Sequence, residues 1–344
     1  MIQHTMEGNV MNGQEEIAKA LRPIERLEIQ VLVDNVTDGL STNPDHVHSE
    51  MRCHVMNGAT LVSGEAICCA HHGLSLIIKA MDGTAAQTML FDAGPEAYAV
   101  ERNGANLKVD FGAIGAMMLS HGHWDHAGGM LQAVRQIRAQ RPEGTLPCYL
   151  NADMFNQRGV QFDNGHVLPM ADVPTPEEYR AAGAEPVVNG AAQLALEKIF
   201  YVSGEIPRVT PYEVGLPGHV ARKDESAAWE PDPLIVDERF LAVHVRGKGL
   251  VVFTACSHAG LINTLTEARA RFPEIPLHAV VGGFHLAGPS NEKIIPDTVR
   301  DLAQFDPQWI VPSHCTGWRA VHALVNAFGE ERVVPNAVGK KIFF

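Results

Sequence analysis

The chain has 344 residues, of which 46% are hydrophobic, and its formal net charge is −13 at pH 7. That apolar content is ordinary for a globular protein, and the length suits one large domain or two smaller ones. The negative charge argues against nonspecific binding to nucleic acid or to an anionic membrane. It does not exclude an anionic small-molecule substrate, because a bound metal ion would set the local field, and it leaves a homo-oligomer open.

The N-terminal residues 1–26 are polar, with a short helical pattern near residues 15–21. The first 20 residues have neither the basic start nor the apolar centre of a secretory signal, and no apolar run in the chain is long enough to span a bilayer. We expect residues 1–26 to be a flexible or loosely docked lead-in to a single domain, residues 27–344. The six cysteines are not spaced as a disulfide framework, so free thiols and a cytoplasmic location are expected.

From residue 27 onward, apolar runs and turn signals predict an α/β chain. The apolar run 111–120 predicts a buried strand that leads into a helix at 127–139. The other strands are predicted at 27–33, 74–78, 88–91, 148–150, 240–245, 250–254, 277–281, 309–311 and 341–344, with helices between those after residue 254. Stretches rich in polar residues, Gly or Pro are expected to be loop insertions near 37–63, 159–190 and 210–233.

The strongest chemical signal is the run His121-Gly122-His123-Trp124-Asp125-His126. Neutral imidazoles and a carboxylate suit zinc, iron or manganese. In an extended loop, His121 and His123 share a face and can reach one ion together. Asp125 and His126 come later and point elsewhere, which suits a second ion nearby. The run lies between a predicted strand and a predicted helix, where open α/β sheets place ligands.

The pattern His-x-His-x-Asp-His after an apolar strand, with Leu90-Phe91-Asp92-Ala93-Gly94 upstream, resembles the metallo-β-lactamase fold superfamily. The resemblance implies an αββα sandwich with a one- or two-metal site on one edge. Several phrases are similar to a narrower branch, the 7,8-dihydropterin-6-methyl-4-(β-D-ribofuranosyl)aminobenzene-5'-phosphate synthase-like proteins. These phrases are Val31-Leu32-Val33-Asp34-Asn35, His72-Gly73-Leu74-Ser75, Gly204-Glu205-Ile206-Pro207-Arg208, Cys256-Ser257-His258-Ala259-Gly260, Gly282-Gly283-Phe284-His285-Leu286 and His314-Cys315-Thr316-Gly317.

The resemblance extends the ligand set beyond the histidine run. It implies that His314, directly after a strand, is the last ligand of the second metal. Cys256 stands where many superfamily members have an aspartate that bridges two metals, so it is either a thiolate ligand or a small core residue. His258 is expected to be a ligand. The third ligand of the first metal is open between His258, His219 and Glu205.

The remaining candidates surround these ligands. His285 follows a strand and is interpreted as a metal ligand, a general acid, a substrate contact or a structural histidine. Asp92 either orients a metal-binding histidine or caps a turn. Substrate contacts to an anionic group are assigned to residues near a helix start or in the branch phrases, namely Arg208, Thr316 and Arg319, with solvated side chains as the alternative.

The sequence favours a metal-dependent hydrolase that acts on an ester, lactone or phosphoester, with one or two Zn²⁺ per chain and Fe or Mn as alternatives. Asp125 would hold a metal or orient the attacking hydroxide, and His285 is the second catalytic candidate. One alternative is a transferase of the dihydropterin type implied by the branch. Another is an iron-dependent redox or ligand-binding protein on the same fold, which is weakened because the chain has no Cys-x-x-Cys pair.

Overall fold

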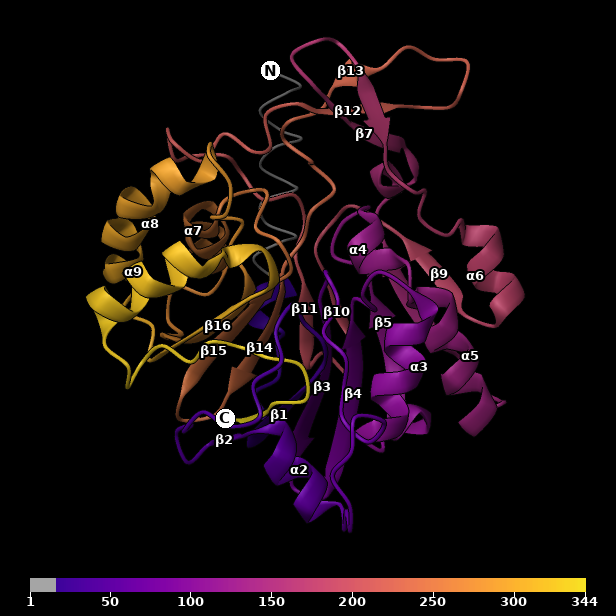
Figure 1. The fold of residues 1–344 in the computed structure, drawn as a ribbon, viewed down its shortest axis with the longest axis vertical. Coiled ribbons are helices and arrows are strands. Elements are labelled where there is room, and N and C mark those ends of the chain that lie inside the picture. The colour runs from indigo at the N-terminus through magenta and orange to yellow at the C-terminus, as the bar shows by residue number, and fades with distance from the viewer. Residues whose placement is uncertain (1–16) are drawn as a thin grey trace.

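The computed structural model describes residues 17–344. Two β-sheets pack face to face, and helices cover the outer face of each (Figure 1). The predicted αββα sandwich is therefore confirmed. Within residues 17–344, no helix is both long enough and apolar enough to cross a membrane.

The first sheet is mixed, and its strands occur in the order β2-β18-β1-β3-β4-β5-β6-β9. A β3–β4 hairpin turns at Asp82–Ala85, as the Asp82-Gly83 signal predicts, and β4, β5, β6 and β9 then run parallel. The bounds are β1 Arg26–Val33, β2 Val47–His48, β3 Ser75–Asp82, β4 Ala85–Phe91, β5 Ile114–Met118, β6 Pro147–Leu150, β9 Glu185–Val188 and β18 Lys341–Phe343.

The second sheet has the order β10-β11-β14-β15-β16-β17. The predicted hairpin across Gly247 is present as β14 and β15, and β15, β16 and β17 are parallel neighbours. The bounds are β10 Gln193–Ala195, β11 Phe200–Val202, β14 Leu241–Val245, β15 Gly249–Thr254, β16 Leu277–Gly283 and β17 Trp309–Ser313.

Alternating side chains bury both faces of the central strands. In β15, Val251 and Phe253 point into the core between the two sheets, whereas Leu250 and Val252 pack under the outer helices. A strand covered on both faces reads as a continuous apolar run, which is why this segment was recognisable in the sequence.

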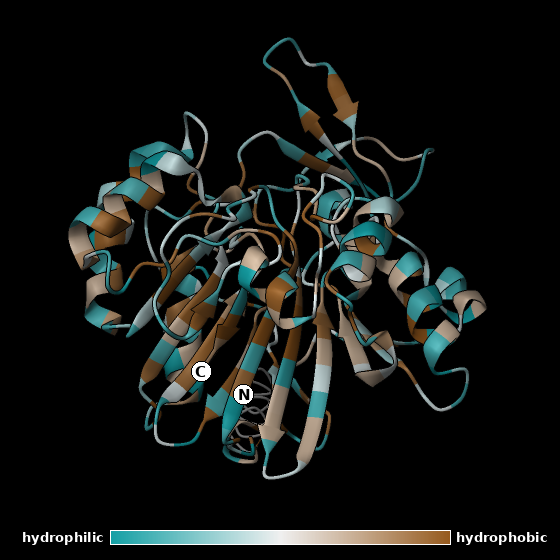
Figure 2. Ribbon diagram, turned by 60° about the horizontal axis from the view of Figure 1, so that its bottom comes forward, coloured by the Kyte–Doolittle hydropathy of each residue, from teal (hydrophilic) through white to brown (hydrophobic). Residues whose placement is uncertain are grey.

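The helices complete the outer layers. Helices α3 and α5 cover the first sheet, and α7, α8 and α9 cover the second (Figure 1). Hydrophobic and hydrophilic residues alternate along these helices, as expected when one face is buried (Figure 2). The bounds are α2 Glu50–Met56, α3 Ala97–Asn106, α4 Trp124–Ala127, α5 Met130–Gln140, α6 Pro176–Ala182, α7 Leu261–Arg271, α8 Ile295–Leu302 and α9 Trp318–Phe328.

The three expected insertions contain regular structure. Residues 37–63 include β2 and α2, and residues 159–190 include α6 and β9. The insertions 159–190 and 210–233 also meet each other in a small sheet of order β13-β12-β7-β8, which projects beyond the sandwich (Figure 1). Its strands are β7 Gln157–Gln161, β8 Val167–Pro169, β12 His219–Arg222 and β13 Glu230–Pro231.

The described residues before β1 pack against the rest of the protein. Ala18, Leu21 and Ile24 are buried in the apolar cores, as in the docked alternative of the expected lead-in. Residues 1–16, with the start of the helical pattern expected near residue 15, lie outside the described residues.

Candidate metal centre

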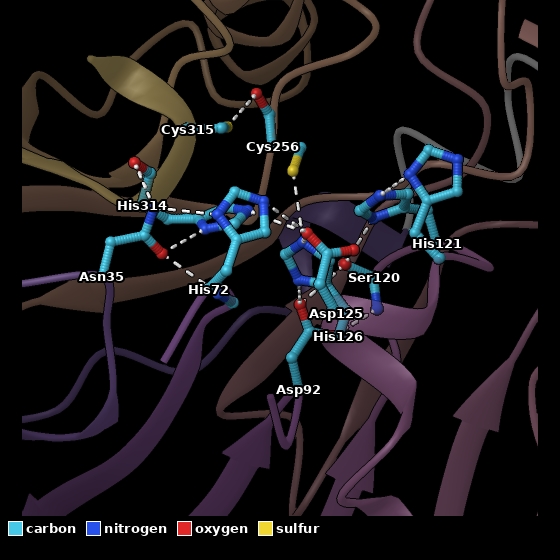
Figure 3. A network of polar contacts seen from close by, with 12 residues as sticks. Asn35, His72, Asp92, Ser120, His121, Asp125, His126, Cys256, His314 and Cys315 are labelled. Carbon is cyan, nitrogen blue, oxygen red and sulfur yellow. Dashed lines mark hydrogen bonds and ion pairs between the residues drawn. The ribbon is translucent and has the colours of Figure 1, made fainter. Parts of the chain in front are cut away.

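Five loops meet at one edge of the sandwich. They follow β4, β5, β15, β16 and β17, and strands β4–β5 and β15–β16–β17 are parallel, so the carboxyl ends of each group lie together. The loops bring together all seven side chains predicted as ligands, which are His121, His123, Asp125, His126, Cys256, His258 and His314. Figure 3 shows most of this cluster.

The first group of donors is formed by histidines. His121 Nε2 lies 3.0 Å from His123 Nδ1, and His123 Nε2 lies 3.1 Å from His219 Nε2. The ring of His258 is centred 4.8 Å from that of His121 and 4.9 Å from that of His123. Both His219 and His258 therefore reach this group, whereas Glu205 is exposed. Of the three alternatives for the third ligand, His219 and His258 are the two whose contacts with this group are described.

His219 reaches the centre through the small sheet. Strand β12 pairs with β7, with His219 opposite Val160. The Nδ1 atom of His219 lies 2.7 Å from the Asp232 carbonyl oxygen, which turns Nε2 toward His123. The pairing of two segments that were predicted as loops thus places the buried His219 side chain at the site.

The second group of donors surrounds Asp125. Its Oδ2 atom lies 3.3 Å from His314 Nε2 and 3.8 Å from His126 Nε2. His126 Nε2 in turn lies 3.1 Å from Cys256 Sγ. His72, which the sequence analysis did not select as a ligand, also reaches Asp125 Oδ2, at 3.5 Å, and is largely exposed.

Cys256 joins the two groups. Its sulfur lies within 4.8 Å of donor atoms of His121 and His258, and likewise within 4.8 Å of donor atoms of His126 and His314. Cys256 is buried at the end of β15. This is the position that the sequence comparison assigned to a bridging residue.

Polar side chains outside the donor cluster contact the Nδ1 atoms of two histidine ligands and orient their rings. Asp92 Oδ2 lies 2.8 Å from His126 Nδ1, and Asp92 Oδ1 accepts the backbone N–H of Ser120 at 2.7 Å. His314 Nδ1 lies 2.9 Å from Asn35 Oδ1. Each contact leaves the Nε2 atom pointing into the cluster, which is how metal-binding histidines are commonly oriented. The structure therefore places Asp92 where the sequence analysis expected an orienting residue.

Two buried carboxylates hold the ligand loops through their backbone. Glu238 accepts the N–H groups of His258 and Ala259, at 2.9 and 2.6 Å. Asp237 accepts the N–H of Gly122 at 2.8 Å and pairs with the buried Arg158. Sequence reasoning missed both carboxylates. The available signal was their position in a charged run directly before a predicted strand.

Four residues of the site have left-handed backbone conformations that non-glycine residues rarely adopt. These are Asp92, Ser257, His285 and His314, with φ between 43° and 60°. Such strain of about 1–3 kcal/mol per residue persists where the surrounding structure imposes it, and it clusters at functional sites.

The electrostatics favour neutral imidazoles in the first group. Burial, together with neighbouring histidines, lowers the pKa of His121 and His258 well below the usual range. Burial also lowers the pKa of His123, with a further contribution from Arg158. Burial lowers the pKa of His126 as well, but Asp125 and Asp92 outweigh it and raise that pKa to about 9. Neutral imidazole is the form that binds metals.

Several buried ring nitrogens in this cluster need a partner. Among the described residues, neither ring nitrogen of His258 has a hydrogen-bond partner, and Nδ1 of His285 also lacks one. An unpaired buried polar group costs about 1–3 kcal/mol. A transition metal ion would satisfy these nitrogens, and imidazole, carboxylate and thiolate are its usual ligands. The residues of the site therefore fit a metal ion.

A small pocket of about 60 Å³ opens beside His258 and His285. Its walls come from the segment Tyr212–Pro217 and from the residues after β16. His285 thus lies between the cluster and this pocket, with its ring centre 4.3 Å from that of His258.

The predicted anion contacts have structural partners instead. The Arg208 guanidinium donates to the carbonyl groups of Ile206, Leu234 and Ile235. The buried Thr316 hydroxyl donates to Ser313 O and accepts the N–H of Phe284. Both terminal nitrogens of Arg208 and the Thr316 hydroxyl thus have partners within the protein, whereas Arg208 Nε has none among the described residues.

Arg319 is also occupied. Its guanidinium pairs with Glu292 at 3.1 Å and lies over the ring of Trp318. Both side chains of the ion pair are on the surface of the α8–α9 layer. The contact matches the alternative of a surface arginine.

Comparison with solved structures identifies the chain as a protein with the metallo-β-lactamase fold. It aligns with a metal-dependent hydrolase of the β-lactamase superfamily at a TM-score of 0.65 and 24% identity, covering 92% of this chain and 98% of that chain. It also aligns with unliganded yeast PDE1 at a TM-score of 0.52 and 11% identity, covering 94% of this chain and 100% of that chain. No protein-family model matches the chain.

Two curated proteins of Methanocaldococcus jannaschii are similar in sequence. One is 7,8-dihydropterin-6-methyl-4-(β-D-ribofuranosyl)-aminobenzene-5'-phosphate synthase, 26% identical over 280 residues, which cover 76% of this chain and 86% of that protein. The other is an uncharacterized protein, 28% identical over 264 residues, which cover 74% of this chain and 88% of that protein. The predicted resemblance to the synthase branch is thus confirmed as a similarity.

Proposed function

We propose that this protein is a metal-dependent hydrolase that holds one or two zinc ions per chain and cleaves an ester, lactone or phosphoester. The observation that carries the proposal is the pair of donor groups that share Cys256, within a cluster of buried imidazoles whose nitrogens need partners. The donor types support zinc, since imidazole and thiolate are its preferred ligands in proteins.

Each residue of the site has a role in this proposal. His121 and His123, with His258 or His219, would hold one ion, and Asp125, His126 and His314 would hold the other. Cys256 lies within reach of donors from both groups. When bound, zinc lowers the pKa of a coordinated water from roughly 15.7 to about 7 and polarises the bond to be cleaved. The Asp125 carboxylate would bind a metal ion or orient the attacking hydroxide. His285, beside the pocket, would either hold a metal ion or give a proton to the leaving group.

A second candidate is a transferase related to the dihydropterin synthase. It is supported by the similarity to that synthase over 86% of its length. The same centre would then activate a different bond, because one fold hosts many reactions. Under either proposal the substrate is a small molecule, and we propose a cytoplasmic location because the six cysteines, all described, form no disulfide.

The test combines metal analysis with a substrate panel. Protein purified without chelators should contain one to two equivalents of zinc. The panel covers a phosphomonoester, a phosphodiester, a lactone, an aryl ester and a β-lactam, assayed with the wild type and with His123→Ala. The exposed His166→Ala serves as the control.

Hydrolysis of at least one compound should depend on metal and fall more than about 100-fold in His123→Ala, because even the outer partners of ligands contribute about 10- to 100-fold. Equal activity in His123→Ala and wild type would refute a role for this centre. A metal-loaded protein that hydrolyses nothing would favour the transferase.

A further inference from the structure

Cys315 belongs to a third group of donors that sequence reasoning did not identify. The sulfur atoms of Cys256 and Cys315 and a ring nitrogen of His285 all lie within 4.8 Å of one another. The three residues come from separate loops, which follow the parallel strands β15, β16 and β17. Figure 3 shows Cys315 beside Cys256, on the side of Cys256 away from Asp92.

The absence of a side chain at Gly283 allows the loops that carry Cys256 and Cys315 to approach each other closely. A Cβ atom at Gly283 would lie 2.7 Å from Cys315 Sγ and 2.2 Å from the Ala255 carbonyl oxygen, so only glycine fits between the two loops. Each loop also holds a strained residue at or next to its donor. His285 is itself left-handed, Ser257 follows Cys256, and His314 precedes Cys315. Strain at all three loops indicates that their positions are imposed rather than relaxed.

Ordinary packing of a small thiol does not account for these surroundings. Cys148 in β6 is an example of ordinary packing, since its thiol is fully buried in an apolar core. Cys315 instead touches Cys256, donating to its carbonyl oxygen at 3.5 Å, and is half-buried beside a histidine whose Nδ1 lacks a partner among residues 17–344. Two sulfurs and a nitrogen that converge in this way match a metal site.

We infer that Cys315 is a metal ligand, and that Cys256, His285 and Cys315 together hold a sulfur-preferring transition metal ion such as zinc. The inference rests on the proposed metal centre and deepens it. Both thiols would bind as thiolates. Three protein donors leave a fourth position open, as in catalytic zinc sites.

Cobalt(II) is the probe, because a thiolate bound to cobalt gives a charge-transfer absorption band that nitrogen and oxygen ligands do not. The full-length chain is stripped with a chelator and titrated with Co²⁺, and bound cobalt is counted by elemental analysis. Cys315→Ser and Cys256→Ser are compared with wild type, and Cys148→Ser is the matched control outside the centre.

Cys315→Ser should lose about half of the charge-transfer band, and Cys148→Ser should keep all of it. A full band in folded Cys315→Ser would overturn the inference. If wild type binds cobalt without any charge-transfer band, the metal centre stands and its sulfur ligands do not. If wild type binds no cobalt, the metal centre fails as well.

A second measurement needs no substitution. Cys315 should react with a maleimide in metal-free protein and be protected at least tenfold in rate after zinc is added, whereas the half-buried Cys69 should react equally in both. The modified residues are assigned by mass spectrometry of peptides. Equal labelling of Cys315 with and without zinc would overturn the inference even if Cys315→Ser did not fold.

Discussion

Asp92 Oδ2 lies 2.8 Å from Nδ1 of His126, and both side chains are completely buried. The contact turns His126 Nε2 toward Cys256 Sγ, 3.1 Å away. Asp92 also accepts the hydroxyl of Ser120 at 2.8 Å, and Ser120 Oγ lies 2.9 Å from Nδ1 of His121. One carboxylate therefore orients a histidine from each donor group.

The first prediction concerns this carboxylate. Asp92→Asn should weaken zinc binding by about 10- to 100-fold, the usual effect of removing a partner behind a ligand. The loss arises because an amide stabilises the imidazole orientation less well than a carboxylate. Zinc affinity is measured by competition with a chromophoric chelator, with the exposed Asp224→Asn as control. An unchanged affinity in Asp92→Asn would show that packing alone orients His126.

The second prediction concerns the buried carboxylate of Glu238. It accepts two N–H groups in the loop that carries His258. Glu238→Gln leaves one of these donors without its charged acceptor, so the free energy of unfolding should fall by about 1–3 kcal/mol. Urea unfolding of the metal-free protein measures this, and the exposed Glu230→Gln should change it little. Equal stability of the two variants would contradict the prediction.

The third prediction is a pH dependence caused by Asp34. Burial raises the pKa of this carboxyl from 3.8 to about 6, although the N–H groups of His314 and Asn35 oppose the rise. The folded state thus holds the proton more tightly than the unfolded state. Protonated Asp34 therefore contributes about 3 kcal/mol to the free energy of unfolding. This contribution is fully present below pH 3.8 and is lost as the pH rises through about 6.

Asp34→Asn should remove this slope, because an amide cannot ionise. Its buried neighbour Asn336 can turn its amide so that Oδ1, which lacks a partner among the described residues, accepts from the new group. The free energy of unfolding of metal-free protein is measured between pH 4 and 7, with the exposed Asp45→Asn as control. Parallel curves for wild type and Asp34→Asn would assign the slope to other groups.

Features that depend on residues close together in the chain could be predicted from the sequence. The two-faced burial of β15 follows from its continuous apolar run, and the His121–His126 motif follows from its spacing after a strand. In both cases the side chains that act together are near neighbours in the chain. Backbone geometry therefore dictates their relative positions, and the pattern can be read without knowing the fold.

The rest of the site depends on contacts between segments that are far apart in the chain. His219 reaches His123 from 96 residues away because β12 pairs with β7, and no local pattern encodes that pairing. Cys315 meets Cys256 because the parallel strands β15 and β17 flank β16 in the second sheet. Conversely, Arg208 was predicted to contact a substrate anion, but in the structure its guanidinium donates to backbone carbonyls of residues 234 and 235. Contacts of this kind depend on which segments the folded core brings together, and that information lies in the whole chain.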